Sequence, residues 1–376
     1  MEKYLADITK FYRGKRVLVT GHTGFKGSWL TFWLSSLGAR VYGYSLSPEK
    51  ESLFKIADIS DRDVYRERFD NITNFDTFDA FFNEAQPEVV FHLAAQPIVS
   101  EGYRFPRSTF ETNVMGTVNV LDCVRRNSDT VKSVVIITTD KVYDDSIEHP
   151  NGFLETYPLN GYDPYANSKS CADLATQCYM DSYFKDMNIP CTIFRAGNVI
   201  GGGDFAKNRI IPDCIRAWRE GEAVELRNPS AVRPYQHVLE PLFAYLVMGA
   251  TQCQDGISDI FNVGPEVGNC VTTETLVKSI SNALYKISGE KLEYTTAEPT
   301  MRENPHLTLN VDHLSENGLK PVWDIDKTIS YTADWYCTQQ WNEGDFYVIR
   351  NLMSRQIEDY CKDAGLYEQE GYHNRS

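Results

Sequence analysis

The chain has 376 residues, of which 42% are hydrophobic and 24% are charged, so it is long enough for more than one domain and buries a real core. Its formal net charge of −15 argues against nucleic acid or an anionic membrane as a general partner, although a local basic site can still bind phosphate. No apolar run approaches the ~20 residues of a membrane helix, and no secretory signal begins the chain. Nine scattered cysteines without zinc spacing predict reduced thiols, no metal site and a cytoplasmic protein.

The first half of the chain alternates apolar strands with amphipathic helices. Strands are expected at 16–20, 41–46, 89–93, 133–138 and 191–194, and helices at 28–37, 75–85, 109–126 and 163–186. Such alternation is typical of a parallel sheet covered on both faces. The sequence therefore predicts an α/β, Rossmann-like, doubly wound domain over residues 1–200.

Past residue 200 the pattern loosens into short segments separated by Pro, Asn and Gly. This predicts a smaller mixed α/β domain over residues 201–376, with a segment near 236–265 that returns to the first domain. The last ~40 residues carry no motif, and a terminal helix with a frayed end is the plainest expectation for them.

A glycine-rich loop, TGHTGFKG, follows the first predicted strand and opens the first predicted helix. Glycine permits a tight turn and lets backbone N–H groups approach a pyrophosphate, which also meets the positive end of the helix. An ordinary glycine-rich turn is the alternative, and the flanking strand and helix favour a dinucleotide. The candidate cofactor contacts in this loop are Gly21, Thr23, Gly24, Phe25, Lys26 and Gly27.

The second predicted strand bears on the choice between NAD and NADP. Its end has Ser45 and Ser47 where an acidic residue often binds the ribose, and no arginine follows before Lys50 to bind a 2′-phosphate. NAD is therefore favoured. Asp58 is a candidate acceptor for the adenine amino group, with an exposed turn residue as the alternative.

Tyr165 and Lys169 are four residues apart in YANSK and share one face of a predicted helix. A phenol has a pKa near 10 in water, and a nearby ammonium can lower it by ~1–3 units. The pair can therefore act as a general base when a hydroxyl proton leaves with hydride, and Lys169 can also hold the cofactor ribose. By itself the spacing also occurs by chance.

Thr139, Asp140 and Lys141 directly follow the predicted strand 133–138. Ligands of parallel sheets bind beyond the carboxyl ends of the strands, so these three side chains are expected in the same crevice as the Tyr–Lys pair. A polar turn that caps a helix is the alternative, and both can hold together.

These segments together resemble the extended short-chain dehydrogenase/reductase family, and within it the nucleotide-sugar 4,6-dehydratases, over about residues 12–330. The motifs are TGHTGFKG, HLAAQ, ETNVMGT, TTDKVY, YANSK and FRAGNVIGGGD. The segments GGGDFAKNRIIPD and RNPSAVRPYQHVLEP resemble the branch whose members act on CDP-glucose. The further cofactor contacts that the resemblance implies are Ile59, Leu93, Ala94, Ala95, Thr112 and Thr138.

The resemblance implies a reaction with bound NAD. The hexose is oxidised at C4, water leaves across C5–C6, and hydride returns to C6 to give a 4-keto-6-deoxy sugar. Tyr165 would be the base that Lys169 tunes, Thr139 would bond the O4 hydroxyl, and Asp140 would protonate the departing C6 hydroxyl. Lys141 stands where many 4,6-dehydratases have a Glu that removes the C5 proton, so it is either a neutralised base or an electrostatic stabiliser.

A nucleotide sugar carries a diphosphate, for which Arg209 and Arg233 are the candidate partners because a guanidinium can bond two oxygens. The other candidate substrate contacts are Gln96, Asn198, Asn228 and Gln236. Nothing in the chemistry of these residues selects cytosine, which is implied by the resemblance alone. Relatives pair through the two long helices, so a homodimer or homotetramer is expected.

Two other functions stay open. A nucleotide-sugar epimerase or decarboxylase also oxidises C4 with a Tyr–Lys pair, but it needs no group to expel the C6 hydroxyl. A nucleotide-sensing protein built on an inactive dehydrogenase would usually lack the Tyr–Lys pair, which is present here.

Overall fold

The computed structural model of the chain describes residues 8–297 and 304–365. Its centre is a parallel sheet of seven strands in the order β11-β6-β5-β4-β1-β2-β3, which confirms the predicted Rossmann-like class. The strands are β1 (Arg16–Thr20), β2 (Arg40–Ser45), β3 (Arg66–Phe69), β4 (Val89–His92), β5 (Ser133–Thr139), β6 (Cys191–Ala196) and β11 (Asp259–Val263). β4, β5 and β6 are buried along their whole length, as expected for strands covered on both faces.

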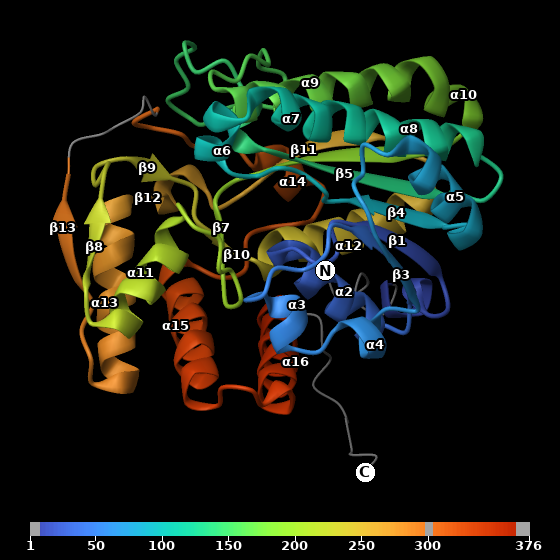
Figure 1. Cartoon of the computed structure of the whole chain (residues 1–376). Coiled ribbons are helices and arrows are strands. Elements are labelled where there is room, and N and C mark those ends of the chain that lie inside the picture. The colour runs from blue at the N-terminus through green and yellow to red at the C-terminus, as the bar shows by residue number, and fades with distance from the viewer. Residues whose placement is uncertain (1–7, 298–303, 366–376) are drawn as a thin grey trace.

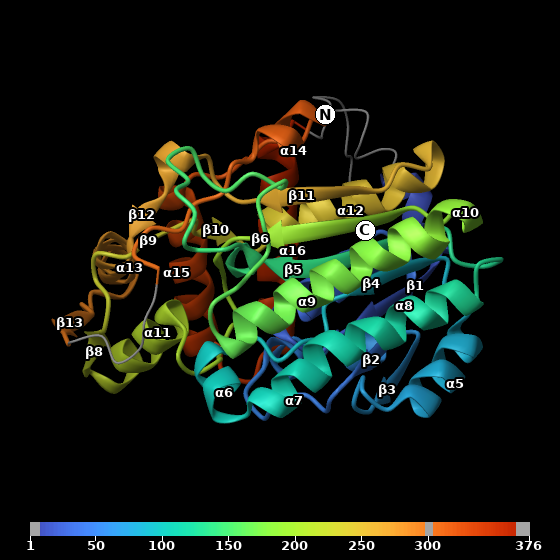
Figure 2. The same ribbon diagram turned by 90° about the horizontal axis from the view of Figure 1, so that it is seen from above.

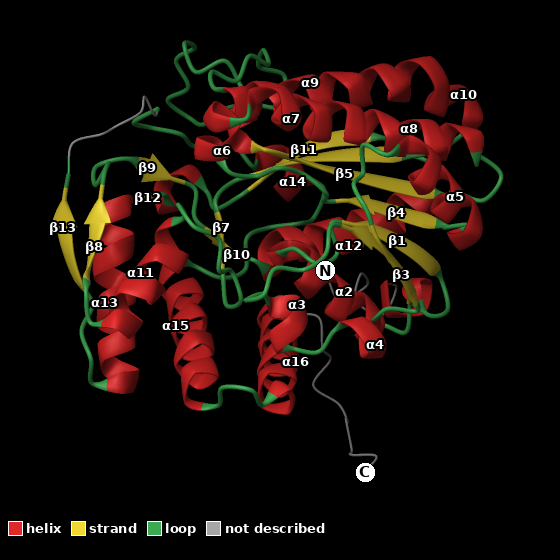
Figure 3. Ribbon diagram, viewed as in Figure 1, coloured by secondary structure: helices red, strands yellow, loops and turns green. Residues whose placement is uncertain are grey.

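Helices cover both faces of the sheet (Figures 1 and 3). One layer contains α5 (Phe75–Ala85), α7 (Pro106–Phe110), α8 (Gly116–Arg126) and α9 (Pro164–Tyr179). The other contains α2 (Phe25–Ser36), α12 (Leu239–Asp255) and α16 (Phe346–Asp363). Seen from above, α8 and α9 run side by side across the strands (Figure 2).

Both long predicted helices contain a π-helical turn. The turn η1 (Glu111–Met115) separates α7 from α8, and η3 (Met180–Phe184) separates α9 from the short α10 (Lys185–Met187). The Asp163 side chain caps α9 by accepting a hydrogen bond from the Ala166 N–H, and Pro164 is its first residue.

The two edge strands were not predicted from the sequence. β3 reads RERF and is largely exposed, so it lacks the apolar run that marks a buried strand. β11 joins β6 at the opposite edge after the long buried helix α12, and both elements lie within residues 236–265. The chain thus returns to the sheet after it has built part of the second lobe.

The second lobe lies beyond the carboxyl ends of β5 and β6 (Figure 1). Its helices are α11 (Ile210–Glu220), α13 (Thr273–Ser288) and α15 (Ile325–Trp341). Its short strands form the pairs β8 (Ala223–Leu226) with β13 (Glu293–Thr296), β9 (Val232–Arg233) with β12 (Val271–Thr272), and β7 (Val199–Ile200) with β10 (Gln236–His237). The remaining short helices are α3 (Leu53–Ile56), α4 (Ser60–Asp63), α6 (Val99–Arg104), η2 (Asp140–Val142), η4 (Val267–Asn269) and α14 (Asp312–Glu316).

The C-terminal helix α16 packs under the sheet rather than in the second lobe. Tyr360 on α16 meets Trp33 of α2 edge to face at 6.2 Å and Phe243 of α12 at 5.8 Å. One apolar cluster therefore extends from the sheet through α2 and α12 to α15 and α16. In the part of the chain that the structure describes, no helix is long and apolar enough to cross a membrane.

Candidate active site

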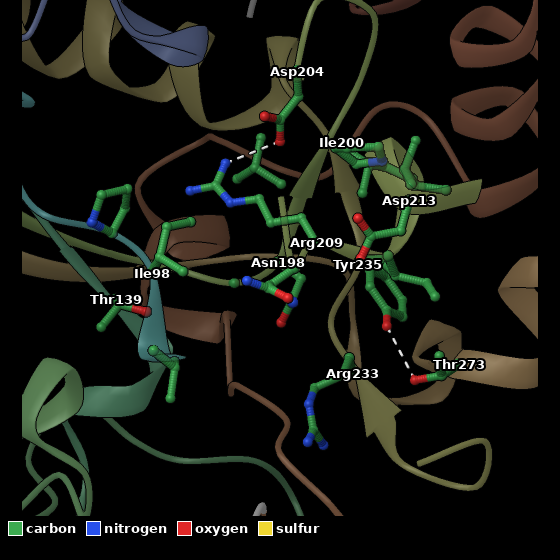
Figure 4. A pocket seen from close by; sticks show the side chains of 18 of the residues that line it. Ile98, Thr139, Asn198, Ile200, Asp204, Arg209, Asp213, Arg233, Tyr235 and Thr273 are labelled. Carbon is green, nitrogen blue, oxygen red and sulfur yellow. Dashed lines mark hydrogen bonds and ion pairs between the residues drawn. The ribbon is translucent and has the colours of Figure 1, made fainter. Parts of the chain in front are cut away.

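A cavity of about 360 Å³ opens where β5 and β6 end, between the sheet and the second lobe (Figure 4). This is the crevice in which parallel sheets bind ligands. It brings together many residues that the sequence singled out: Phe25, Lys26, Thr138, Thr139, Asp140, Lys141, Tyr165, Asn198, Arg209, Asn228 and Arg233.

The glycine loop forms a cradle without side chains. Gly21 has a φ of +74°, and a Cβ there would lie 2.7 Å from the backbone N of Ala94. A Cβ on Gly27 would collide with the Gly21 carbonyl. α2 begins at Phe25, three residues earlier than predicted, so its first N–H groups lie directly behind the loop. A pyrophosphate fits such a cradle, because backbone donors and the helix dipole face it at close range.

Neighbouring loops complete this edge of the sheet. The Thr23 hydroxyl bonds to the Ser45 hydroxyl at 2.7 Å and donates to the Leu46 carbonyl at 3.0 Å, which ties the glycine loop to the end of β2. Leu93, Ala94 and Ala95 follow β4, and the backbone of Leu93 and Ala94 lies against Gly21. Thr112 lies on η1, beside Asn113, which bonds to the backbone of this same loop at Gln96.

The structure does not place Asp58 and Ile59 at the edge where the cofactor would lie. They stand between α3 and α4, before β3 begins. Ile59 is fully buried in the core, and Asp58 pairs with Arg62 at 2.8 Å. β3 has no apolar run in its sequence, so the position at its end was not singled out. The residue that follows β3 is Asp70, which replaces Asp58 as the candidate adenine contact.

Tyr165 and Lys169 lie on the buried face of α9. Burial raises the pKa of Tyr165 to about 12, while the Thr139 side chain that bonds it and the Arg209 charge lower it. Burial lowers the pKa of Lys169 to about 8, against the Asp173 carboxylate, which raises it. The Lys169 ammonium donates to the Ile137 carbonyl at 2.8 Å. A cation with a fixed position thus lies one helical turn from a phenol.

Thr139, Asp140 and Lys141 form the turn that leaves β5. The Thr139 hydroxyl donates to one oxygen of Asp140 at 2.8 Å, and the other oxygen, Oδ2, is buried without a protein partner. Burial raises the pKa of Asp140, against the opposing effects of Lys141, Thr139 and Arg233. A carboxyl group that holds its proton more firmly than usual is suited to act as an acid.

Lys26, on the first turn of α2, is half-buried and lines the same cavity as Tyr165. Burial lowers its pKa to about 7, and the charges of Lys169 and Arg209 lower it further, while Asp140 raises it. The cavity therefore gathers several cationic groups in a chain whose net charge is −15.

Two arginines reach the cavity from the second lobe (Figure 4). Arg209, which precedes α11, bonds to Asp204 at 2.9 Å, and Arg233 lies on β9 with its guanidinium donating to the Val232 carbonyl. The side-chain oxygen of Asn198 is buried and has no protein partner. These groups provide positive charge and a hydrogen-bond acceptor without a protein partner along one wall of the cavity.

Two predicted substrate contacts are engaged elsewhere. The Gln96 amide donates to Thr109 at 2.9 Å and accepts from the Ile98 N–H at 2.5 Å, so both of its ends hold the loop after β4. Gln236 is buried and donates to the Val263 carbonyl at 2.8 Å. Neither residue lines the cavity, because each serves the packing of its own segment.

Several residues of the cavity were not predicted. Arg227 directly precedes the predicted Asn228, so its position in the sequence could have suggested that it lines the cavity. Tyr235 and Thr273 bond to each other at 3.2 Å across the far end of the cavity (Figure 4). They are 38 residues apart, so no local pattern could have joined them.

Comparison with known proteins identifies the family. The chain matches the model of the NAD dependent epimerase/dehydratase family over residues 17–264. It belongs to this family. CDP-glucose 4,6-dehydratase of Salmonella typhimurium strain LT2 is 39% identical over 364 residues, which are 93% of this chain and 97% of that relative. dTDP-glucose 4,6-dehydratase of Shigella flexneri is 25% identical over 85% of this chain and 92% of the relative.

Solved structures of similar fold include two UDP-glucose 4-epimerases. The Thermotoga maritima protein, crystallised with UDP-glucose, superposes with a TM-score of 0.73 at 21% identity, covering 86% of this chain and 99% of that one. The Thermus thermophilus protein, crystallised with NAD, has a TM-score of 0.72 at 24% identity, covering 85% of this chain and 98% of that one. The cofactor of this family is NAD, and the glycine cradle at Gly21 and Gly27 fits its pyrophosphate.

Proposed function

We propose that this member of the NAD-dependent epimerase/dehydratase family converts CDP-glucose to CDP-4-keto-6-deoxyglucose. The observation that supports dehydration is the buried acid Asp140 with Lys141 beside it, in the cavity that also holds Tyr165. An epimerase leaves the C6 hydroxyl of its sugar in place and needs no such acid. The choice of CDP-glucose is supported by the 39% identity to a CDP-glucose 4,6-dehydratase.

Tyr165 removes the O4 proton of the hexose, and Lys169 stabilises the resulting phenolate. Burial raises the pKa of the phenol to about 12 even though Thr139 and Arg209 lower it, so the base needs further positive charge close by. NAD⁺ held in the cradle at Gly21 and Gly27 would supply the hydride chemistry at C4 and C6, and its positive charge would also favour the phenolate. The Thr139 hydroxyl orients the O4 hydroxyl toward Tyr165.

Water then leaves across C5 and C6. Asp140 protonates the departing C6 hydroxyl, a role supported by the raised pKa of this carboxyl and by its oxygen without a protein partner. Lys141 acts at C5, either as a neutral base or as a charge that stabilises the enolate. The variants Lys141→Ala and Lys141→Glu distinguish a reacting Lys141 from a structural one.

The nucleotide diphosphate is assigned to the wall of the second lobe. Arg209 and Arg233 neutralise the phosphates, while Asn198, Asn228 and Arg227 supply further hydrogen bonds. Residues 1–200 with the returning segment 236–265 would thus hold NAD, and most of residues 201–376 would hold the sugar nucleotide.

The assembly is proposed to be a homodimer or homotetramer that pairs through α8 and α9. Exposed hydrophobic side chains on this layer support it, with Met115 49%, Leu174 51% and Tyr183 40% exposed. Light scattering after size-exclusion chromatography would measure the oligomeric state. A cytoplasmic location is supported by the free state of all nine cysteines.

The function is tested with purified protein, NAD⁺ and a panel of CDP-, dTDP-, GDP- and UDP-hexoses, followed by mass spectrometry. Loss of one water from CDP-glucose without net NADH is expected. Loss of water from another sugar nucleotide alone would keep the dehydration and overturn the choice of base. An unchanged mass with every sugar would favour an epimerase, which NMR of the same samples would reveal.

A further inference from the structure

Below the catalytic pair, α9 carries a third buried polar residue on the same face. Tyr165, Lys169 and Asp173 follow one another at intervals of four residues, so they stack along the helix. Their exposed fractions are 9%, 5% and 0%. Burying a carboxylate is costly unless other groups compensate its charge, so the partners of Asp173 indicate what it does.

The Asp173 carboxylate joins three elements. Arg195 on β6 donates to both oxygens, with two distances of 2.9 Å, and is itself 1% exposed. The Thr138 hydroxyl on β5 donates at 3.1 Å, and the Gln177 amide donates from the next turn of α9 at 2.8 Å. Bidentate pairing of this kind fixes orientation as well as charge. One side chain thus holds α9 against the two strands whose ends form the active site.

The other end of this network is also held. The Arg195 guanidinium donates to the Tyr143 hydroxyl at 3.0 Å and to the Glu155 carbonyl at 2.7 Å. Tyr143 in turn donates to Asn262 on β11 at 2.6 Å. Arg195 is therefore anchored independently of Asp173, so removal of the carboxylate would leave a buried cation in place.

Other groups around Lys169 do not supply negative charge. Lys26 from α2 carries an amine, which cannot be negatively charged, and His92 from β4 is neutral, since burial and Lys169 lower the pKa of that imidazole to about 3. Tyr165 is the phenol that Lys169 serves. Asp173 is the charge that raises the pKa of Lys169 against its burial.

We propose that Asp173 is a positioning residue for the catalytic pair, which holds α9 in register with β5 and β6 and places a carboxylate one helical turn from Lys169. This inference rests on the proposed function, in which Lys169 tunes Tyr165. Without the carboxylate, Lys169 would lose its proton at a lower pH, and the phenolate would lose its stabilising charge.

The direct test measures the titration of Lys169 by NMR of protein labelled with carbon-13 at lysine Cε, with Lys169→Met used to assign its signal. In Asp173→Asn, purified with NAD, the midpoint should fall by about one pH unit or more, because the carboxylate is lost and Arg195 is left unpaired. Gln177→Met is the matched control. It removes a neutral hydrogen bond to the same carboxylate and should leave the midpoint unchanged.

Activity supplies a second readout. In Asp173→Asn the kcat for dehydration should decline on the alkaline side at a lower pH than in the wild type, and Asp173→Glu should restore the profile. A purely structural residue would lower kcat by the same factor at every pH. If Asp173→Asn does not fold, Asp173→Asn/Arg195→Met removes both buried charges together, and the midpoint should fall by a smaller amount.

An unchanged Lys169 midpoint in a folded variant would overturn the inference, even in an enzyme that remains active. Conversely, if the midpoint falls in Asp173→Asn but the wild-type protein does not dehydrate CDP-glucose, the proposed function is refuted and the charge relation between Asp173 and Lys169 stays intact.

Discussion

The pKa values of the side chains around the cavity differ from those in water mainly because these side chains are buried. Burial pushes the pKa of Tyr165 up to about 12 and that of Lys169 down to about 8, so each is moved toward its neutral form. Burial also raises the pKa of Asp140. The site thus disfavours charge until ligands bring charges of their own, which suits proton transfers that occur only with substrate present.

Lys141 gives the sharpest prediction at this scale. Lys141→Ala should stop the reaction after oxidation at C4, because nothing then acts on the C5 proton or the enolate, and water loss should slow by about 10²–10⁴-fold. Reduced cofactor would accumulate and be seen by its near-ultraviolet absorbance. Lys141→Glu should keep part of the activity, because a carboxylate can accept the proton.

Lys185 on α10 is exposed, and Lys185→Ala is the control for the loss of a lysine. This variant should behave as the wild type. Normal turnover by Lys141→Ala would show that Lys141 has no part in elimination.

At the scale of elements, the carboxyl ends of the strands determine where the chemistry lies. The glycine loop after β1 and the turn after β5 were found from the sequence because each motif is local and directly follows an apolar strand. Asp70 was not singled out because the charged strand β3 gave no signal and two short helices precede it. Tyr235 and Thr273 meet only through the fold, so no sequence window contains both.

Gly27→Ala tests the cradle. Its Cβ would meet the Gly21 carbonyl and the backbone of His22, so loop and helix must separate. We expect a loss of about 1–3 kcal/mol in the free energy of unfolding together with weaker NAD binding, measured by thermal denaturation and calorimetric titration. Gly268→Ala, where a Cβ meets nothing within 4 Å, is the matched control. Equal NAD affinity in the two variants would argue against the cradle.

At the scale of the whole molecule, the C-terminal segment fastens the second lobe to the sheet. Glu240 on α12 is buried and accepts hydrogen bonds from the N–H groups of Val322 and Trp323 and from the Tyr360 hydroxyl of α16. Burial raises its pKa to about 7. The sequence did not predict this contact, since it joins residues 120 positions apart.

His237 lies next to this junction, and its burial predicts that the stability of the protein depends on pH. It packs against Trp323 at 4.8 Å between ring centres, and burial lowers its pKa from 6.5 to about 3. A base with a lowered folded-state pKa contributes stability above pH 6.5 that is lost as the pH falls toward 3. Protonation of Glu240 raises the stability as the pH falls from 7 to 4.5, which opposes the effect of His237. A variant is therefore needed to separate the contributions of the two residues.

His237→Gln cannot take up this proton. The difference between its melting temperature and that of the wild type should therefore narrow as the pH falls from about 8 toward about 5. A difference that stays constant over this range would mean that His237 does not titrate on unfolding.

The central claim is that one molecule of bound NAD moves a hydride from C4 to C6 of the same sugar. CDP-glucose carrying deuterium at C4 tests it most directly, with the product analysed by mass spectrometry and NMR. Intramolecular hydride transfer predicts loss of one water and deuterium on C6 of the 4-keto-6-deoxy product. Release of the deuterium into solvent, or its recovery in free NADH, would contradict it.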